Sequence, residues 1–188
     1  MTAKPKSAPP FSLPKPLVLV GMMGAGKTAV GRRLAARFNL PFVDADEEIE
    51  LAAGCTISDI FALHGEAAFR DGERRVIERL LKQSVCVLAT GGGAFIDPGV
   101  RAAIKETGIS IWLKADLETL WHRVRRRSHR PLLNTEDPKG TLERLIQTRY
   151  PVYAEADITV ESNDGPLDET VDRVITYVER FLATDARS

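Results

Sequence analysis

The chain has 188 residues, of which 44% are hydrophobic and 28% are charged, a composition that suits one globular domain with a buried core. Its 26 basic and 26 acidic residues balance, so no overall positive field favours nucleic acid or an anionic membrane as a partner. The two cysteines, Cys55 and Cys86, lack metal-ligand spacing. No apolar run approaches the roughly 20 residues of a membrane helix. We therefore expect a cytoplasmic protein.

The first elements in chain order are a leader, a strand and a helix. Residues 1–15 are rich in proline and lysine and contain no acidic residue, which predicts a disordered leader. Residues 17–20 predict a buried strand, and residues 28–38 carry apolar side chains at helical spacing. Between them, residues 21–28 read GMMGAGKT, which satisfies the G-x-x-x-x-G-K-[ST] pattern of a phosphate-binding loop. The sequence thus predicts a bound nucleoside triphosphate.

Glycines allow such a loop to turn successive N–H groups toward phosphate oxygens at the start of a helix. The residues expected to bind ATP here are Gly24, Ala25, Gly26, Lys27 and Thr28. The Lys27 ammonium is expected to reach the outer phosphates, and the Thr28 hydroxyl is expected to ligate a magnesium ion that bridges them.

The rest of the chain alternates short apolar runs with helical patterns, which is typical of a parallel sheet covered by helices. Further strands are expected at residues 41–43, 85–89, 109–113 and 158–160. Two helical patterns separate the second and third strands, the second of them at residues 66–82, and a final helix is expected at residues 167–182. The pattern weakens near residues 125–140, which predicts a mobile lid.

Two aspartates, Asp44 and Asp46, follow the second strand, where the ends of parallel strands border a ligand crevice. The third strand contains no acidic residue, so Asp44 is expected to supply a carboxylate for magnesium. Asp46 is expected to accept a hydrogen bond from a substrate hydroxyl, either orienting it or taking its proton. Alternatively, one of the two caps the next helix, and this does not exclude catalysis.

Glycine occupies three consecutive positions after the third strand, at Gly91, Gly92 and Gly93. This pattern removes side chains where another molecule would approach the backbone, although a flexible turn is an alternative. Arg70 suits a planar carboxylate, with Glu73 one turn later to hold the guanidinium. A solvated position on a helix face is the alternative for Arg70, and also for Arg149.

A basic run at residues 123–131 lacks interleaved aromatic residues, so neutralisation of phosphate fits it better than nucleic-acid binding. Within this run, Arg130 is expected to swing over the triphosphate and to stabilise the charge that develops during transfer.

Taken in order, these motifs resemble the shikimate kinases, small phosphate-loop kinases that transfer the γ-phosphate of ATP to the 3-hydroxyl group of shikimate. The resemblance covers roughly residues 17–182. It implies a three-layer α/β P-loop kinase domain over residues 16–184, with a five-stranded parallel sheet in the order 2-3-1-4-5 and a mobile lid. It also implies a substrate-binding segment near residues 45–75 and a product that feeds aromatic amino-acid biosynthesis through chorismate.

The resemblance also implies roles for individual residues. Shikimate would be held by Asp46, Arg70, Gly92 and Arg149, together with the neighbouring Gly91 and Gly93. ATP and magnesium would be organised by Lys27, Thr28 and Asp44, with Arg123 near the adenine and Arg130 closing from the lid. The residues expected to act in the transfer itself are Lys27, Asp46 and Arg130.

One departure from the family pattern is Ala29, because members often carry a second hydroxyl residue at that position. The expected ligands are ATP, shikimate and Mg²⁺, and a monomer is expected. A gluconate kinase, a nucleoside monophosphate kinase and a nucleotide-dependent switch are alternatives that share the loop.

Overall fold

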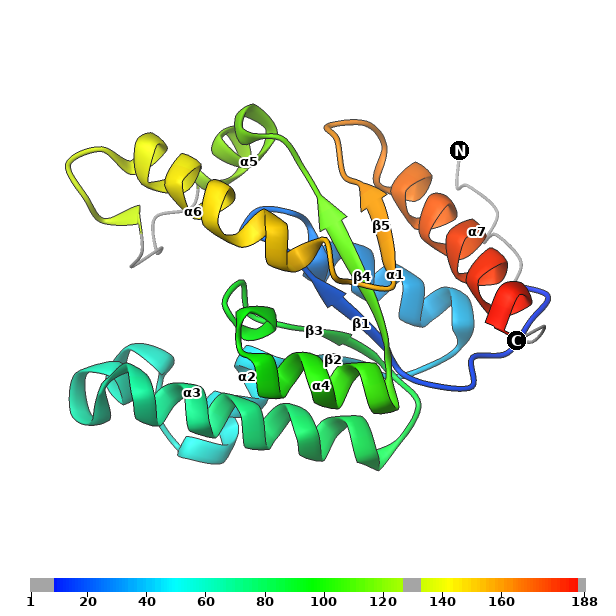
Figure 1. Ribbon diagram of the computed structural model, residues 1–188, viewed down its shortest axis with the longest axis horizontal. Helices are drawn as coiled ribbons and strands as arrows, with labels where there is room; N and C mark the ends of the chain where they lie inside the picture. Colours follow the sequence, from blue (N-terminus) through cyan, green and yellow to red (C-terminus); the bar gives the residue numbers. More distant parts are fainter. Residues whose placement is uncertain (1–8, 127–132, 186–188) are drawn as a thin grey trace, which may run out of the picture.

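A five-stranded parallel sheet lies at the centre of the computed structural model, which describes residues 9–126 and 133–185 (Figure 1). Its strands are β1 (Leu17–Val20), β2 (Phe42–Asp44), β3 (Val87–Ala89), β4 (Ile109–Lys114) and β5 (Ile158–Glu161). Their order across the sheet is β2-β3-β1-β4-β5. Both the parallel sheet and its order are as predicted.

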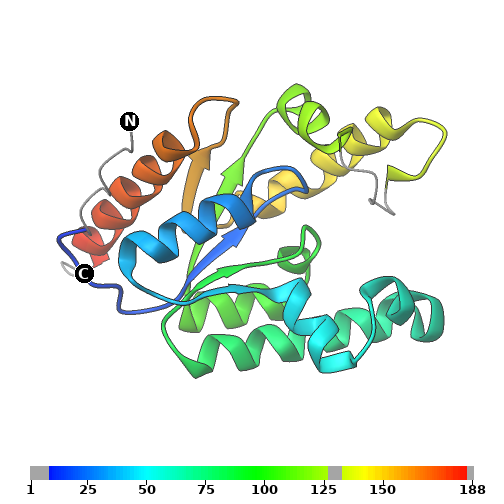
Figure 2. The ribbon, with the colours of Figure 1, turned by 180° about the vertical axis from the view of Figure 1, so that it is seen from behind.

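Helices cover both faces of this sheet and make three layers. They are α1 (Lys27–Phe38), α2 (Ala45–Ala53), α3 (Ile57–Gln83), α4 (Pro98–Thr107), α5 (Leu117–Val124), α6 (Pro138–Tyr153) and α7 (Leu167–Asp185), with the short 3₁₀ helix η1 (Ala94–Ile96). Helices α4 and α6 lie over the face seen in Figure 1. Helices α1 and α7 lie over the opposite face, seen in Figure 2.

The position of each strand explains its residue pattern. All four residues of β1 are buried, because β1 is central and helices cover both of its faces. At the edge of the sheet, β5 buries Ile158 and Val160 and exposes the two residues that alternate with them. The core therefore lies along the central strands.

Side-chain caps set where several helices begin. Asp97 and Asp137 cap α4 and α6, and each of these helices begins with a proline. Helix α3 starts with a capping box between Thr56 and Asp59 and is interrupted at Gly65, where φ is 80°. This interruption divides α3 into two pieces, and the second piece matches the helix expected at residues 66–82, whereas α2 and the first piece both precede it.

Residues 9–15, which belong to the leader expected to be disordered, lie against the core. The ring of Phe11 packs edge-on against Phe38, with ring centroids 5.5 Å apart, and Leu13 also contacts the core. Removing two large apolar side chains from water favours this ordered placement even in a proline-rich segment. Residues 1–8 of the leader and residues 186–188, which follow the predicted domain, lie outside the described residues.

Gly31 allows α1 to approach the sheet closely, and this contact is open to test. A Cβ atom at Gly31 would lie 2.5 Å from Cε2 of Phe42 and 3.1 Å from Cδ1 of Leu19. We predict that Gly31→Ala lowers the free energy of unfolding by about 1–3 kcal/mol, as measured by urea denaturation, because the packed core must shift to admit the methyl group.

The matched control is Gly72→Ala, since Gly72 also lies within a helix but has nothing within 4 Å of an added Cβ atom. That variant should gain up to about 1 kcal/mol through helix propensity. Equal stabilities for the two variants would show that α1 does not need this close approach.

Candidate active site

Three motifs from the sequence meet at one edge of the sheet. The phosphate-binding loop follows β1, the aspartate pair lies at the end of β2 and the start of α2, and the glycine triplet comes shortly after β3. These strands are adjacent and parallel, so their carboxyl ends lie at the same edge. The register pairs Ala89 with both Leu19 and Asp44, which brings the three strand ends level.

The phosphate-binding loop has the backbone conformation that its glycines permit. Gly21, Gly24 and Gly26 have φ angles of 136°, 81° and 94°, which other residues rarely adopt. Gly26 is also the N-cap of α1 and contributes no side-chain hydrogen bond. The helix start thus presents backbone amides rather than a capping side chain, as expected of an anion site.

Lys27 reaches back over the loop from the start of α1. Its Nζ donates hydrogen bonds to the carbonyl oxygens of Gly21 and Met22, at 2.7 and 2.9 Å. The ammonium therefore lies within the loop, where the sequence analysis expected it to meet phosphate.

Asp44 takes part in two contacts at once. One oxygen accepts a hydrogen bond from the Asp46 amide at 3.0 Å, which makes Asp44 the N-cap of α2. The other oxygen accepts a hydrogen bond from the Thr28 hydroxyl at 3.2 Å. Asp44 therefore caps α2 and also lies beside Thr28. These two contacts are compatible, as expected from the sequence.

A hydroxyl and a carboxylate side by side match the oxygen ligands that Mg²⁺ prefers. Within residues 9–126 and 133–185, no group of three or more His, Cys, Asp or Glu side chains is arranged to hold a metal. A magnesium ion here would thus depend on ligands from a bound nucleotide as well as from Thr28 and Asp44.

The glycine triplet lies beneath polar side chains from other segments. A Cβ atom at Gly91 would lie 2.8 Å from Oδ1 of Asp46, and one at Gly93 would lie 2.6 Å from Nη2 of Arg70. That a ligand approaches this backbone stays a prediction, and the structure shows in addition that Asp46 and Arg70 need the absence of side chains here. Larger residues at positions 91 and 93 would displace Asp46 and Arg70.

Arg70 is held by Glu73, as the spacing predicted. Nη1 of Arg70 lies 2.6 Å from Oε2 of Glu73, and Glu73 is only 1% exposed. Burial raises the pKa of the Glu73 carboxyl, against the lowering effect of Arg70, and Asp46 and Asp97 raise it further. Pairing with Arg70 lets this carboxylate remain buried.

The carbonyl of Gly92 accepts hydrogen bonds from two side chains of α6. Arg149 donates to it through Nη1 at 3.2 Å, and the Tyr153 hydroxyl donates to it as well. Burial raises the pKa of Tyr153 to about 12, so this hydroxyl keeps its proton at neutral pH. No role for Tyr153 was predicted from the sequence, although its position one turn after Arg149 places both side chains on one helix face.

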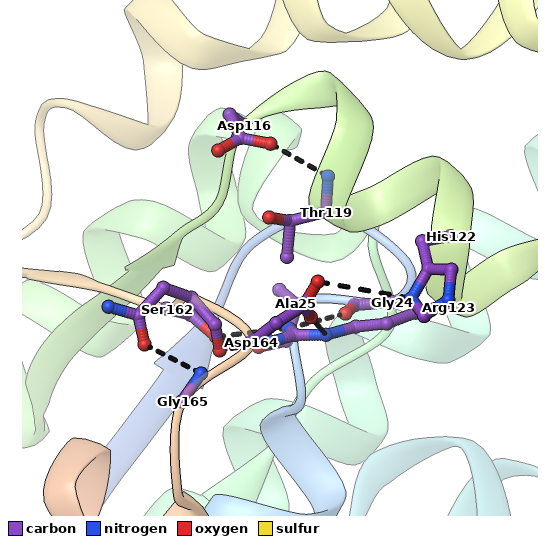
Figure 3. Close-up of polar contacts among 10 residues, drawn as sticks. Gly24, Ala25, Asp116, Thr119, His122, Arg123, Ser162, Asp164 and Gly165 are labelled. Atoms are coloured by element: carbon purple, nitrogen blue, oxygen red, sulfur yellow. Dashed lines mark hydrogen bonds and ion pairs between the residues drawn. The ribbon is translucent and has the colours of Figure 1, made fainter.

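Arg123 joins α5 to the phosphate-binding loop and to the segment after β5 (Figure 3). Nη1 donates to the Gly24 carbonyl and to Oγ of Ser162, each at 3.1 Å, and Nε lies 3.1 Å from Oδ1 of Asp164. Nη2 donates to the carbonyl of Asn163. The structure thus places Arg123 beside the phosphate-binding loop, where most of its donors contact the protein itself.

Arg130 lies outside the described residues, as do residues 127–132 as a whole. Of the lid predicted at residues 125–140, the described part includes the start of α6 at Pro138. In the part of the chain that the structure describes, no helix is both long and apolar enough to span a membrane.

Comparisons with known proteins match the chain to one family. The family model for shikimate kinase matches residues 23–179. The shikimate kinase of Cereibacter sphaeroides is 56% identical over 172 residues, covering 92% of this chain and 84% of that protein. The one from Paramagnetospirillum magneticum is 59% identical over 167 residues, covering 87% and 86%.

Solved structures similar to this chain also include shikimate kinases. Shikimate kinase from Acinetobacter baumannii, determined in complex with shikimate, has a TM-score of 0.84 at 39% identity, over 88% of this chain and 93% of that one. A gluconokinase from Sinorhizobium meliloti has a TM-score of 0.64 at 19% identity, over 94% and 98% of the two chains, which shows a shared fold alone. With the family model spanning most of its length and relatives above 50% identity, this chain belongs to the shikimate kinase family.

Proposed function

We propose that this protein transfers the γ-phosphoryl group of ATP to the 3-hydroxyl group of shikimate, giving shikimate 3-phosphate and ADP. The observation that carries the proposal is the contact between the phosphate-binding loop and the glycine triplet. A Cβ atom at Gly92 would lie 3.4 Å from the amide nitrogen of Met23 and 3.7 Å from the carbonyl oxygen of Gly21. The loop for the phosphoryl donor therefore directly adjoins the segment around which Asp46, Arg70 and Arg149 gather.

The acceptor side suits a small anion that also carries hydroxyl groups. Arg70 and Arg149 bring two guanidinium groups to the triplet, Arg70 beside Gly93 and Arg149 beside Gly92. Guanidinium forks bind planar carboxylates through paired hydrogen bonds. Relatives with the family name act on shikimate, which has both a carboxylate and ring hydroxyl groups, and we assign the carboxylate to these two arginines.

Asp46 is the carboxylate that we assign to the reacting hydroxyl. Its Oδ1 lies against Gly91, and its backbone amide is fixed by the cap that Asp44 makes. A carboxylate at hydrogen-bond distance from an alcohol orients the oxygen for attack and takes up its proton as the bond to phosphorus forms. In this assignment Asp46 binds and orients, while the arginines fix the rest of the acceptor.

On the donor side, Lys27 and the loop amides would hold the phosphates of ATP. Lys27 and the loop amides would also stabilise the negative charge that builds up on the transferred phosphoryl group. Lys27 is a flexible side chain, whereas the amides belong to the backbone. A magnesium ion between Thr28 and Asp44 would neutralise phosphate charge. Arg123 near the adenine and Arg130 over the phosphates belong to the same proposal.

The test is an ADP-release assay over a panel of acceptors, with the product identified by mass spectrometry. We expect fast ADP release and a phosphorylated product with shikimate, but slow release with gluconate, nucleoside monophosphates or no acceptor. Folded protein that binds ATP and yields no shikimate 3-phosphate would contradict the proposal.

Two variants separate the donor and acceptor sides in this assay. Lys27→Ala should lower kcat about 10²-fold or more, because a donor to the developing charge is lost. Arg70→Ala should mainly raise KM for shikimate and leave KM for ATP unchanged. The division of roles would be wrong if both variants lost ATP affinity to the same extent.

Glu73 gives a prediction about stability and pH. The pKa of Glu73 in the folded protein is raised above its ordinary value of 4.5, so the folded state binds this proton more tightly than the unfolded state does. The tighter proton binding stabilises the folded state fully below pH 4.5, and this stabilisation is lost as pH rises through the folded-state pKa of Glu73. We therefore expect the stability of Glu73→Gln, relative to the parent protein, to increase between pH 4.5 and pH 7.5 in urea denaturation.

The matched control for that measurement is Glu66→Gln. Glu66 also lies near Arg70, with Oε1 3.6 Å from Nε, but its side chain is 71% exposed. Its replacement should change the free energy of unfolding by less than about 1 kcal/mol, because an ion pair with an exposed partner contributes little. A difference between Glu73→Gln and the parent protein that stays constant over this pH range would argue against a buried carboxylate under Arg70.

Asp44→Asn tests the proposed magnesium ligand without removing the cap, since asparagine also caps helices well. We expect the Mg²⁺ concentration for half-maximal activity to rise about tenfold, with little change in thermal stability. Asp97→Asn is the control, because Asp97 caps α4 and makes no contact with Thr28 in the structure. An unchanged Mg²⁺ requirement in Asp44→Asn would remove Asp44 from the metal site.

A further inference from the structure

Two carbonyl groups of the phosphate-binding loop accept hydrogen bonds from side chains in distant parts of the chain. The carbonyl of Gly24 accepts a hydrogen bond from Arg123 on α5, and that of Ala25 accepts one from the Ser162 hydroxyl at 2.8 Å. Ser162 directly follows β5 and lies 137 residues beyond Ala25 in the sequence. Figure 3 shows these groups converging on the loop.

The Ser162 hydroxyl has one proton, and its surroundings determine where that proton lies. Nη1 of Arg123 lies 3.1 Å from Oγ and can only donate a hydrogen bond. Oγ therefore accepts from Arg123 and donates its own proton to the Ala25 carbonyl. Ser162 is 6% exposed, so water does not readily replace either bond.

The backbone of Ser162 is fixed as firmly as its side chain. Its amide donates to the Lys114 carbonyl at 2.6 Å, which continues the pairing of β4 with β5. Arg123 in turn is held by Asp164, whose Oδ2 also lies 3.8 Å from Nδ1 of His122. The donor to Ala25 is thus anchored to the sheet.

The Ala25 carbonyl fixes the amide of the next residue as well. The described peptide bonds are all trans, and in a trans peptide the C=O and the following N–H point in opposite directions. Holding the Ala25 carbonyl toward Ser162 therefore turns the Gly26 N–H away from Ser162. Gly26 is the N-cap of α1 and one of the motif glycines whose amide is expected to meet phosphate.

We propose that Ser162 is a positioning residue for phosphate binding, because its hydroxyl orients the Ala25–Gly26 peptide and so aims the Gly26 amide at a nucleotide phosphate. The proposal deepens the donor half of the proposed function and concerns polyphosphate affinity rather than the identity of the acceptor. It requires no contact between Ser162 and the ligand.

The experiment measures binding of inorganic tripolyphosphate and of ADP to the full-length protein by calorimetry, without any acceptor. For Ser162→Ala we expect both affinities to fall by a similar factor of about ten, because one hydrogen bond no longer fixes the peptide. KM for shikimate should stay within twofold of the parent value. Ser162→Thr keeps a hydroxyl and should restore tripolyphosphate binding.

Ser110→Ala is the matched control for lost stability. Ser110 is also buried, and its Oγ donates to Asp157 at 2.6 Å. This variant should unfold more easily and bind tripolyphosphate normally.

Three results would overturn the proposal. Unchanged tripolyphosphate binding in Ser162→Ala with weaker ADP binding would place the effect on the base or ribose. Equal losses in Ser162→Ala and Ser110→Ala would mark a general effect of instability, and unchanged binding of both ligands would remove the role entirely. Because tripolyphosphate binding needs no phosphoryl acceptor, failure of shikimate phosphorylation would leave this test intact.

Discussion

When the peptide groups of a phosphate-binding loop turn their amides inward, their carbonyls point outward and need hydrogen-bond donors there. In this protein three side chains supply such donors. Lys27 serves the carbonyls at the start of the loop, Arg123 on α5 serves Gly24, and Ser162 after β5 serves Ala25. A buried carbonyl without a partner would cost about 1–3 kcal/mol, so these contacts favour one loop shape over others. The loop is local in sequence, but its shape depends on the packing of α5 and β5 around it.

The same principle governs the acceptor side. The Gly92 carbonyl is held by Arg149 and Tyr153, both from α6, and Gly92 in turn lies against Met23 of the phosphate-binding loop. Two backbone segments that would otherwise be flexible are therefore fixed by side chains and then meet each other. Under the proposed function, this arrangement would set the separation between the phosphoryl donor and the acceptor before either binds, which would reduce the cost of bringing them together.

Glu73 shows what such preorganisation costs. A carboxylate that is almost fully buried loses most of its hydration, and its attraction to Arg70 only partly offsets that loss, since its pKa is raised rather than lowered. A shorter or apolar residue would avoid the penalty but would leave the guanidinium of Arg70 without its closest partner. The buried carboxylate therefore trades stability for a fixed orientation of the arginine.

The sequence by itself determined the parts that depend on local chemistry. Periodicity located the five strands, since buried parallel strands read as apolar runs. The motif around Lys27 predicted a phosphate site, because the glycines of such a loop are needed locally. Tertiary structure decided the rest. The burial of Glu73, the double role of Asp44 and the contacts of Tyr153 and Ser162 each depend on a partner in another element. A single serine after an edge strand carries no local pattern that marks it, because its role arises only when β5 packs beside the phosphate-binding loop.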